Sequence, residues 1–321
     1  MVILISGASH TGKTLLAQRL MERYHYPVFS IDLLKMGLIR SSQTELTPED
    51  DDLLTPYLWE IVKEIIKTAI ENGQNLIVEG CYIPLDWKDD FDPDYLSQIE
   101  HVCLVMTRGY LEEHGNDVLR FENVIERRRF NEIDTHKLAE ENERSLTSCL
   151  QHGLRYHLID SGYDVGTQEI GPLSANDLDA AARLFCDTVH TINARDYTPK
   201  QLEAWAPRNA QHHAQIAEKL ATQQTVGIKE CGILAGFGSL DGSGDIDMLF
   251  VHKDRQRQGI AAAILQELEK LAAKRGKQTV STFASITAQP FFEHAGYTTL
   301  RENSVVRDGV SLVNYHMSKQ L

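Results

Sequence analysis

The segment GASHTGKT, from Gly7 to Thr14, holds the first residues whose types and spacing could do chemistry. It matches the pattern G-x-x-x-x-G-K-[ST], in which glycines let backbone N–H groups turn inward around phosphate oxygens. A helix start adds a partial positive charge at the same place. The alternative is a tight strand-to-helix turn without a ligand. We predict a phosphate-binding loop made of Gly7, Ala8, Ser9, His10, Thr11, Gly12, Lys13 and Thr14.

A second turn, QRQGIA, runs from Gln256 to Ala261 and fits the pattern [QR]-x-x-G-x-[GA]. The pattern alone is too short to be specific, but an alternating strand (DIDMLFV, 245–251) precedes it and a long amphipathic helix follows it. Amides at such a helix start can bind an anion. Alternation puts Asp245, Asp247 and Leu249 on one face of the strand, which gives that face two carboxylates.

The elements that must position the first turn alternate between strands and helices. Apolar runs predict strands at 2–6, 27–32, 75–80, 101–106 and 155–160, and helical spacing predicts helices over 13–24 and 51–73. Strands that alternate with helices indicate a parallel sheet. We predict an α/β domain over residues 1–166.

The pattern changes in the polar, glycine-containing segment 161–171, where we place the domain boundary. Helical stretches are predicted over 176–189 and 198–221, followed by strands over 225–230, 233–240 and 245–251. A helix over 259–275, a strand over 278–285, a short helix over 288–295 and strands over 297–302 and 311–318 complete the chain. This order predicts an α+β domain with a mostly antiparallel sheet over residues 167–321.

Composition narrows the classes of function. The 321 residues carry a net charge of −14, which argues against a dedicated binder of nucleic acid or anionic membranes. The five cysteines form no CxxC pair, which favours reduced thiols in a cytoplasmic protein. No apolar run reaches the ~18 residues of a membrane span. We expect small-molecule substrates, with no nucleic-acid or membrane partner.

The first turn, so near the N-terminus, resembles that of the small P-loop kinases: nucleoside-monophosphate, shikimate and gluconate kinases, with zeta-toxin and chloramphenicol phosphotransferase relatives. The resemblance covers residues 1 to about 160 and is strong at Gly7–Thr14. It implies a P-loop NTPase or kinase domain that uses ATP and Mg²⁺. Lys13 would reach the β- and γ-phosphates, and the Thr14 hydroxyl would bind Mg²⁺.

The same resemblance implies three further roles. Asp32, at the end of the second strand, would orient or deprotonate the acceptor hydroxyl; alternatively it is the N-cap of a helix that begins at Leu33. Glu79, at the end of the third strand, would hold a Mg²⁺-bound water. Arg127, in the basic run ERRRF, would clamp phosphates during transfer, or belong to a solvated face.

The second half resembles the GNAT superfamily of acetyl-CoA-dependent N-acetyltransferases over 170–321, through QRQGIA, FFEHAGY (291–297) and ARDYTPKQLEAWAP (194–207). The resemblance implies that the CoA pyrophosphate binds the turn formed by Gln256, Arg257, Gln258, Gly259, Ile260 and Ala261. It also implies that pantetheine and the acetyl carbonyl run beside the backbone of Leu249, Phe250 and Val251, where an N–H would stabilise an oxyanion.

Acetyl transfer needs a group that takes a proton from the acceptor amine. Asp247 is the first candidate for this general base, directly or through water, and Asp245 is the second. Alternatively, one of these carboxylates only binds a cationic substrate.

The group that protonates the departing thiolate is less clear, because Phe292 stands where many GNAT members carry a tyrosine. Tyr315, Tyr297 or Ser285 could replace it, or no acid is needed. Tyr297 is also expected as a core residue. The early helices carry Tyr197 and Trp205, which would line the acceptor pocket or pack in the core.

These observations predict a bifunctional enzyme, a kinase-like ATP-binding domain fused to a small-molecule N-acetyltransferase. One rival is an acetyltransferase regulated by a non-catalytic nucleotide-binding domain. Another makes the first domain a partner-binding or toxin–antitoxin-like module.

Overall fold

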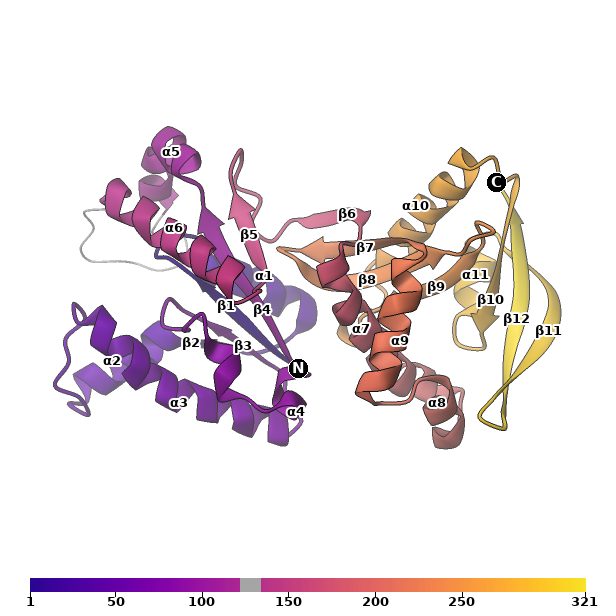
Figure 1. The fold of residues 1–321 in the computed structure, drawn as a ribbon, viewed down its shortest axis with the longest axis horizontal. Coiled ribbons are helices and arrows are strands. Elements are labelled where there is room, and N and C mark those ends of the chain that lie inside the picture. The colour runs from indigo at the N-terminus through magenta and orange to yellow at the C-terminus, as the bar shows by residue number, and fades with distance from the viewer. Residues whose placement is uncertain (122–133) are drawn as a thin grey trace. The chain divides into compact units, whose positions relative to one another are not determined.

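The computed structural model describes residues 1–121 and 134–321, in two compact units (Figure 1). Unit 1 comprises residues 1–167 together with 231–233, and unit 2 comprises residues 168–230 and 234–321. The sequence-based boundary at 166/167 lies one residue from the first division between the units.

Unit 1 contains a five-stranded sheet in the order β2-β3-β1-β4-β5, and every pair in it is parallel. The predicted parallel α/β sheet is therefore confirmed. Its strands are β1 (Val2–Gly7), β2 (Val28–Ser30), β3 (Leu76–Glu79), β4 (Ile99–Met106) and β5 (Tyr156–Ile159). Its helices are α1 (Lys13–Tyr24), α2 (Ile31–Arg40), α3 (Asp51–Glu71), α4 (Pro93–Leu96), α5 (Arg108–Phe121), α6 (Thr135–Gln151) and a 3-10 turn (Trp87–Asp90).

The central strand β1 is buried on both faces, as its continuous apolar run predicts. Ile3 and Ile5 pack in one cluster with Leu16 and Leu20 of α1, and Leu4 packs in another with the apolar face of α3. Each fully buried aliphatic side chain contributes about 1.5–3 kcal/mol relative to an exposed one. The two cores fix the end of β1, and hence the turn that follows it.

One prediction in unit 1 was wrong. Strand β2 ends at Ser30 rather than 32, and α2 begins at Ile31 with Ser30 as its N-cap residue. Asp32 therefore neither ends a strand nor caps a helix. It lies in the first turn of α2, where a carboxylate interacts favourably with the helix dipole.

Unit 2 contains a seven-stranded sheet in the order β11-β12-β10-β9-β8-β7-β6. The pairs β6–β7, β8–β9, β10–β12 and β11–β12 are antiparallel, and β9–β10 is parallel. Its strands are β6 (Gln168–Pro172), β7 (Gln224–Glu230), β8 (Ile233–Leu240), β9 (Ile246–Val251), β10 (Thr279–Ser285), β11 (Thr298–Arg307) and β12 (Val310–Gln320). Its helices are α7 (Leu178–Thr191), α8 (Pro199–Trp205), α9 (Ala210–Ala221), α10 (Ile260–Lys274), α11 (Gln289–His294) and the 3-10 turns Ala175–Asp177, Asn193–Arg195 and Lys253–Arg255.

Helices cover both faces of this sheet (Figure 1). Ile264 and Leu268 of α10 share a buried cluster with Val280 of β10. Phe185 of α7 packs in a separate cluster with Phe237 of β8. The sheet therefore separates the side on which α10 lies from the side on which α7 lies.

The structure departs from the predicted elements of unit 2 in two places. The stretch 198–221 forms two helices rather than one, because Pro207 lacks an N–H and restricts the residue before it, and α8 ends at Trp205. Asn209 then caps α9 through a hydrogen bond from the His212 amide. The expected linker 161–171 also contains most of β6.

Among the described residues, no helix is both long enough and apolar enough to cross a membrane.

Candidate functional site

The turn from Gly7 to Thr14 joins β1 to α1 and depends on its two glycines. Both have positive φ, +132° at Gly7 and +89° at Gly12. A Cβ on Gly7 would collide with the Leu104 carbonyl, and a Cβ on Gly12 would collide with the Tyr163 hydroxyl. The N-cap residue of α1 is Gly12, with no side-chain cap, so its first amides remain suited to a bound anion.

Three polar side chains of unit 1 meet at this turn. The Lys13 ammonium donates to the Ala8 carbonyl at 2.7 Å. The Thr14 hydroxyl donates to Glu79 Oε2 at 3.4 Å, and Glu79 is only 1% exposed at the end of β3. A cation, a hydroxyl and a buried carboxylate thus lie at the carboxyl edge of the sheet, where parallel α/β sheets bind their ligands. They can hold a phosphate and a divalent cation.

A hydrogen-bonded chain connects Asp32 to the start of α3. Lys35 Nζ lies 3.2 Å from Asp32 Oδ1 and donates to the Tyr82 hydroxyl at 2.7 Å. Tyr82 in turn donates to Asp51 Oδ1 at 2.6 Å. Burial, with nearby Cys81 and Asp51, raises the pKa of Tyr82, so the phenol remains a donor. Sequence reasoning found Asp32 and missed Lys35, three residues further along the same helix, and Tyr82, which lies far away in the sequence.

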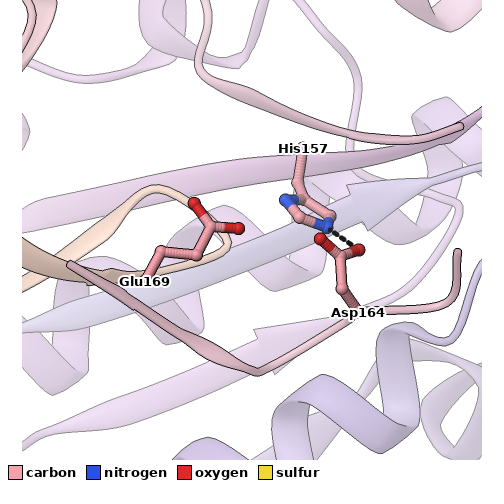
Figure 2. A group of neighbouring side chains, drawn as sticks. All are labelled: His157, Asp164 and Glu169. Carbon is pink, nitrogen blue, oxygen red and sulfur yellow. Dashed lines mark hydrogen bonds and ion pairs between the residues drawn. The ribbon is translucent and has the colours of Figure 1, made fainter. Parts of the chain in front are cut away.

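The loop after β5 brings Tyr163 to the first turn. His157 Nε2 and Asp164 Oδ1 lie 2.8 Å apart and fix this loop (Figure 2). Burial raises the pKa of Tyr163 to about 12, so its hydroxyl stays protonated beside Gly12. Tyr163 was not predicted as a site residue.

Arg127, which was predicted to clamp phosphates during transfer, lies outside the described residues.

The predicted arrangement of Asp245, Asp247 and Leu249 on one face of β9 was wrong. Ser239 of β8 pairs with Met248 and Leu240 pairs with Ile246, so the register skips Asp247. This irregularity is a β-bulge, which interrupts alternation and re-aims the bulged residue. Ile246 accordingly packs in the cluster of α10, whereas Met248 packs in the cluster of α7.

Asp245 connects strands instead of facing open space. Its Oδ1 accepts the Ser281 amide of β10 at 2.9 Å and lies 3.2 Å from Lys277 Nζ. Burial acts to raise the pKa of Asp245, but the hydrogen bonds from Ser281 and Lys277 outweigh it and hold the pKa below its ordinary value. These contacts suit a structural carboxylate better than a base.

Asp247 faces α9. Its Oδ2 lies 2.6 Å from Lys219 Nζ and accepts a hydrogen bond from Gln223 Nε2 at 2.7 Å. About a quarter of the Asp247 side chain is exposed. The Asp245 side chain is equally exposed, at 28%, so the two predicted carboxylates differ in their partners: Asp245 is held by the backbone of β10 and by Lys277, and Asp247 only by side chains.

The turn before α10 has the backbone shape of an anion site. Arg257 and Gly259 have positive φ, +61° and +81°, and Gly259 is the N-cap of α10 with no side-chain cap. A Cβ on Gly259 would meet nothing within 4 Å. The amides of Ile260 and Ala261 begin this helix, whose first four N–H groups have no partner within the helix itself. They can hold a phosphate.

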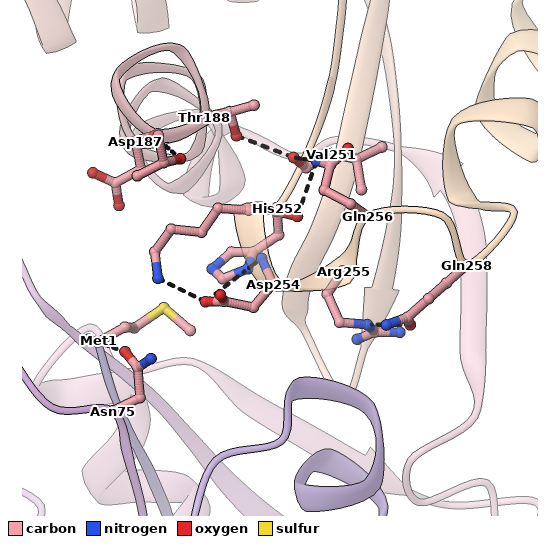
Figure 3. A network of polar contacts seen from close by, with 12 residues as sticks. Met1, Asn75, Asp187, Thr188, Val251, His252, Asp254, Arg255, Gln256 and Gln258 are labelled. Atoms are coloured by element: carbon pink, nitrogen blue, oxygen red, sulfur yellow. Dashed lines mark hydrogen bonds and ion pairs between the residues drawn. The ribbon is translucent and has the colours of Figure 1, made fainter. Parts of the chain in front are cut away.

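A buried ion pair lies directly before this turn, and sequence reasoning missed it. Arg255 is fully buried, and its Nη2 lies 2.9 Å from Glu230 Oε1. Its Nε donates to Gln258 Oε1 at 2.7 Å (Figure 3). Glu230 is 1% exposed and also accepts from Gln168. This network fastens the turn to β7.

The backbone beyond Ile246 leaves the ladder with β10. In the described part of the chain, β9 and β10 are registered only at Ile246 and Thr282. Leu249 and Phe250 pair with β8 on their other side, so their β10 side is open to a ligand's hydrogen bonds. The Val251 carbonyl, by contrast, already accepts from Thr188 and Gln256 (Figure 3).

Four of the candidate aromatic residues pack in buried clusters, namely Phe292, Tyr297, Tyr197 and Trp205. Tyr297 is 3% exposed and donates to Glu269 at 3.1 Å, and burial raises its pKa, so it packs as a core residue. Phe292 is buried against it. Tyr197 donates to the Val313 carbonyl at 2.7 Å and packs against Trp205. Tyr315 is half-buried on β12 opposite Ala284, and its role as an acid stays a prediction.

Comparison with known proteins places relatives on the second half of the chain. A family model described as an acetyltransferase (GNAT) domain matches residues 193–319. The uncharacterized N-acetyltransferase YafP of Escherichia coli (strain K12) is 30% identical over 145 residues, which are 44% of this chain and 88% of YafP.

Solved structures are similar over the same share of the chain. A GCN5-related N-acetyltransferase from Rhodopseudomonas palustris, also described as a class-II aminotransferase, is 34% identical, with a TM-score of 0.46, over 49% of this chain and 98% of its own. The PaiA N-acetyltransferase from Thermoplasma acidophilum, solved with coenzyme A, is 17% identical, with a TM-score of 0.38, over 48% of this chain and 99% of its own.

Proposed function

The chain belongs to the GNAT acetyltransferase family, and from that premise we propose that unit 2 transfers the acetyl group of acetyl-CoA to the amine of a small molecule. The observation that carries this proposal is the turn before α10, where Gly259 has positive φ and no side chain caps the helix. The open space around Gly259 fits a pyrophosphate at the helix amides. The thioester supplies an activated acetyl group.

In this proposal, different residues of unit 2 bind acetyl-CoA, accept the proton of the amine and hold the strands in place. The amides of the segment 257–261 bind the pyrophosphate. The backbone of Leu249 and Phe250, open toward β10, binds the pantetheine arm and polarises the thioester carbonyl. Asp247 accepts a proton from the acceptor amine, directly or through water. Asp245 holds β9 and β10 together through its bond to Ser281.

A second activity, ATP- and Mg²⁺-dependent phosphoryl transfer to a small-molecule hydroxyl, is proposed for unit 1. The supporting observation is that Lys13, Thr14 and the buried Glu79 meet beside an uncapped helix start. Lys13 would contact the outer phosphates, and Thr14 and Glu79 would hold the metal with its water. Asp32, paired with Lys35, would orient the acceptor hydroxyl.

Two alternatives for unit 1 fit the same residues. Unit 1 could bind nucleotide and regulate the acetyltransferase without chemistry, or it could bind a partner protein. Nucleotide binding without turnover would favour the regulator. Consumption of ATP that depends on a small molecule would favour the kinase. We propose that both activities take place in the cytoplasm and act on small molecules.

One experiment tests both activities. The full chain is incubated with pooled metabolites and antibiotics, ATP, Mg²⁺ and acetyl-CoA, and products are detected by mass spectrometry. The expected result is a compound that gains the mass of an acetyl group and one that gains the mass of a phosphoryl group. If no amine in the pool is acetylated although acetyl-CoA is consumed, the small-molecule amine is the wrong acceptor class.

A further inference from the structure

The carboxylate of Asp247 already holds a primary amine that belongs to this chain. Lys219, in the last turn of α9, places its Nζ 2.6 Å from Asp247 Oδ2. Gln223 donates to the same oxygen at 2.7 Å. An acceptor amine would present the same kind of group to Asp247. The chain therefore offers its own substrate-like nitrogen to the residue that we propose as general base.

The pair between Lys219 and Asp247 can open easily. Its side chains are 47% and 26% exposed, respectively. Ion pairs this exposed contribute roughly 0–1 kcal/mol to stability, so holding the fold together does not account for this one. The four-carbon stem of lysine is flexible, which lets the nitrogen leave the carboxylate and move along β9.

The distance that the nitrogen must cover is short. Leu249 follows Asp247 by two residues, which is about 7 Å along a strand that rises about 3.3 Å per residue. The bulge turns Asp247 toward α9, and the backbone beyond it is open toward β10. The proposed transfer requires the Lys219 side chain to carry Nζ about 7 Å along β9, to the backbone where we place the thioester carbonyl.

We propose that Lys219 is an acetylation site that the enzyme modifies by itself. The inference rests on the acetyl-transfer function proposed above. Asp247, directly or through water, takes a proton from the Lys219 ammonium. Nζ then forms a bond to the carbonyl carbon of acetyl-CoA and releases its second proton to water. The carbon–sulfur bond breaks, and the electron pair leaves with the CoA thiolate, which takes up a proton from solvent.

The product changes the site. Acetyl-lysine is neutral, so residue 219 no longer forms an ion pair with Asp247. The carboxylate keeps the hydrogen bond from Gln223 and becomes open to an external amine. Acetylation of Lys219 would therefore remove an internal competitor of the acceptor.

The experiment needs no knowledge of the acceptor. Purified full-length protein is incubated with acetyl-CoA alone, and acetylation of each lysine is followed by peptide mass mapping. Lys270 is a matched control, because it is also on a helix, is 56% exposed and pairs with Glu267 at 3.3 Å. Lys219 is expected to gain its acetyl group at least about tenfold faster than Lys270.

The variant Asp247→Asn separates catalysis from intrinsic reactivity. In this variant, acetylation of Lys219 by acetyl-CoA should fall at least about tenfold, to the level of Lys270. Labelling by dilute acetic anhydride, without acetyl-CoA, should change in the opposite direction, because Asp247 no longer shields Nζ. A thermal shift with acetyl-CoA checks that the variant remains folded and binds it.

Two results would overturn the proposal. If Lys219 is acetylated no faster than Lys270, or equally fast in wild type and Asp247→Asn, the active site does not modify it, and acetyl transfer to small molecules still stands. If the wild-type chain shows no thermal shift with acetyl-CoA, the proposed function of unit 2 fails, and this inference fails with it.

Discussion

The turn before α1 and the turn before α10 share a backbone shape but differ in where their charges lie. Both helices begin after a glycine of positive φ without a side-chain cap. In unit 1, the ammonium of Lys13 lies within the turn itself. In unit 2, Arg257 within the turn is exposed, and Arg255, directly before the turn, is fully buried and paired with Glu230.

The residues that hold each turn in place also differ in charge. Ser6, just before the first turn, shares a 2.8 Å hydrogen bond with His101, whose pKa burial lowers to about 3. That support is neutral at ordinary pH, whereas the support of the second turn is an ion pair. The two turns therefore differ in what holds them, a neutral hydrogen bond in unit 1 and a buried ion pair in unit 2.

The largest expected effect is on the ion pair. Arg255→Met leaves the Glu230 carboxylate buried without its cation, which should lower the free energy of unfolding by about 3–5 kcal/mol in urea titrations. The double variant Arg255→Met/Glu230→Leu should recover most of this loss. Arg275→Met, at an exposed arginine of the same unit, is the control. A loss below about 1 kcal/mol for Arg255→Met would show that the pair does not support the turn.

The next effect concerns the base. Asp247→Asn should lower acetyl transfer to an external amine on the order of 10²-fold at low pH, because asparagine keeps the shape and loses the basicity. As pH rises, the amine deprotonates unaided and the variant should approach wild type, as rate–pH profiles would show. A deficit that is independent of pH and matched by a higher acceptor KM would make Asp247 a binding residue only.

The smallest effect concerns the neutral support. Because the pKa of His101 is lower in the folded protein than the ordinary value of 6.5, the unfolded chain binds more protons below pH 6.5. Stability from this group is complete above pH 6.5 and falls by up to about 1.4 kcal/mol per pH unit as pH drops toward 3. His101→Phe should reduce this dependence between pH 7 and 5 in urea titrations. An unchanged slope would contradict the account of the first turn.

Sequence patterns predicted the structural features that depend only on residues close together in the chain. The two glycine turns and the helices after them were predicted because backbone shape and apolar spacing are encoded within a few residues. The bulge at Asp247 was not, because the register between β8 and β9 depends on both strands. The contacts of Arg255 and Lys35 were missed for a similar reason, since Glu230 and Tyr82 meet them only after the chain has folded.

The central claim is that the two turns bind different ligands independently, and binding measurements on two variants test it directly. Lys13→Ala should lose affinity for Mg·ATP and keep its affinity for acetyl-CoA in calorimetric titrations. Gly259→Val should lose at least about tenfold in affinity for acetyl-CoA and keep Mg·ATP, because a β-branched residue is strained at this φ and covers the helix amides.

Gly276→Val is the matched control, because Gly276 has a φ of +82° and equally open surroundings at the other end of α10. It should carry similar strain without changing either affinity. If Lys13→Ala and Gly259→Val each weaken both ligands equally in folded protein, or if Gly259→Val leaves acetyl-CoA binding unchanged, the assignment of one turn to each ligand is wrong.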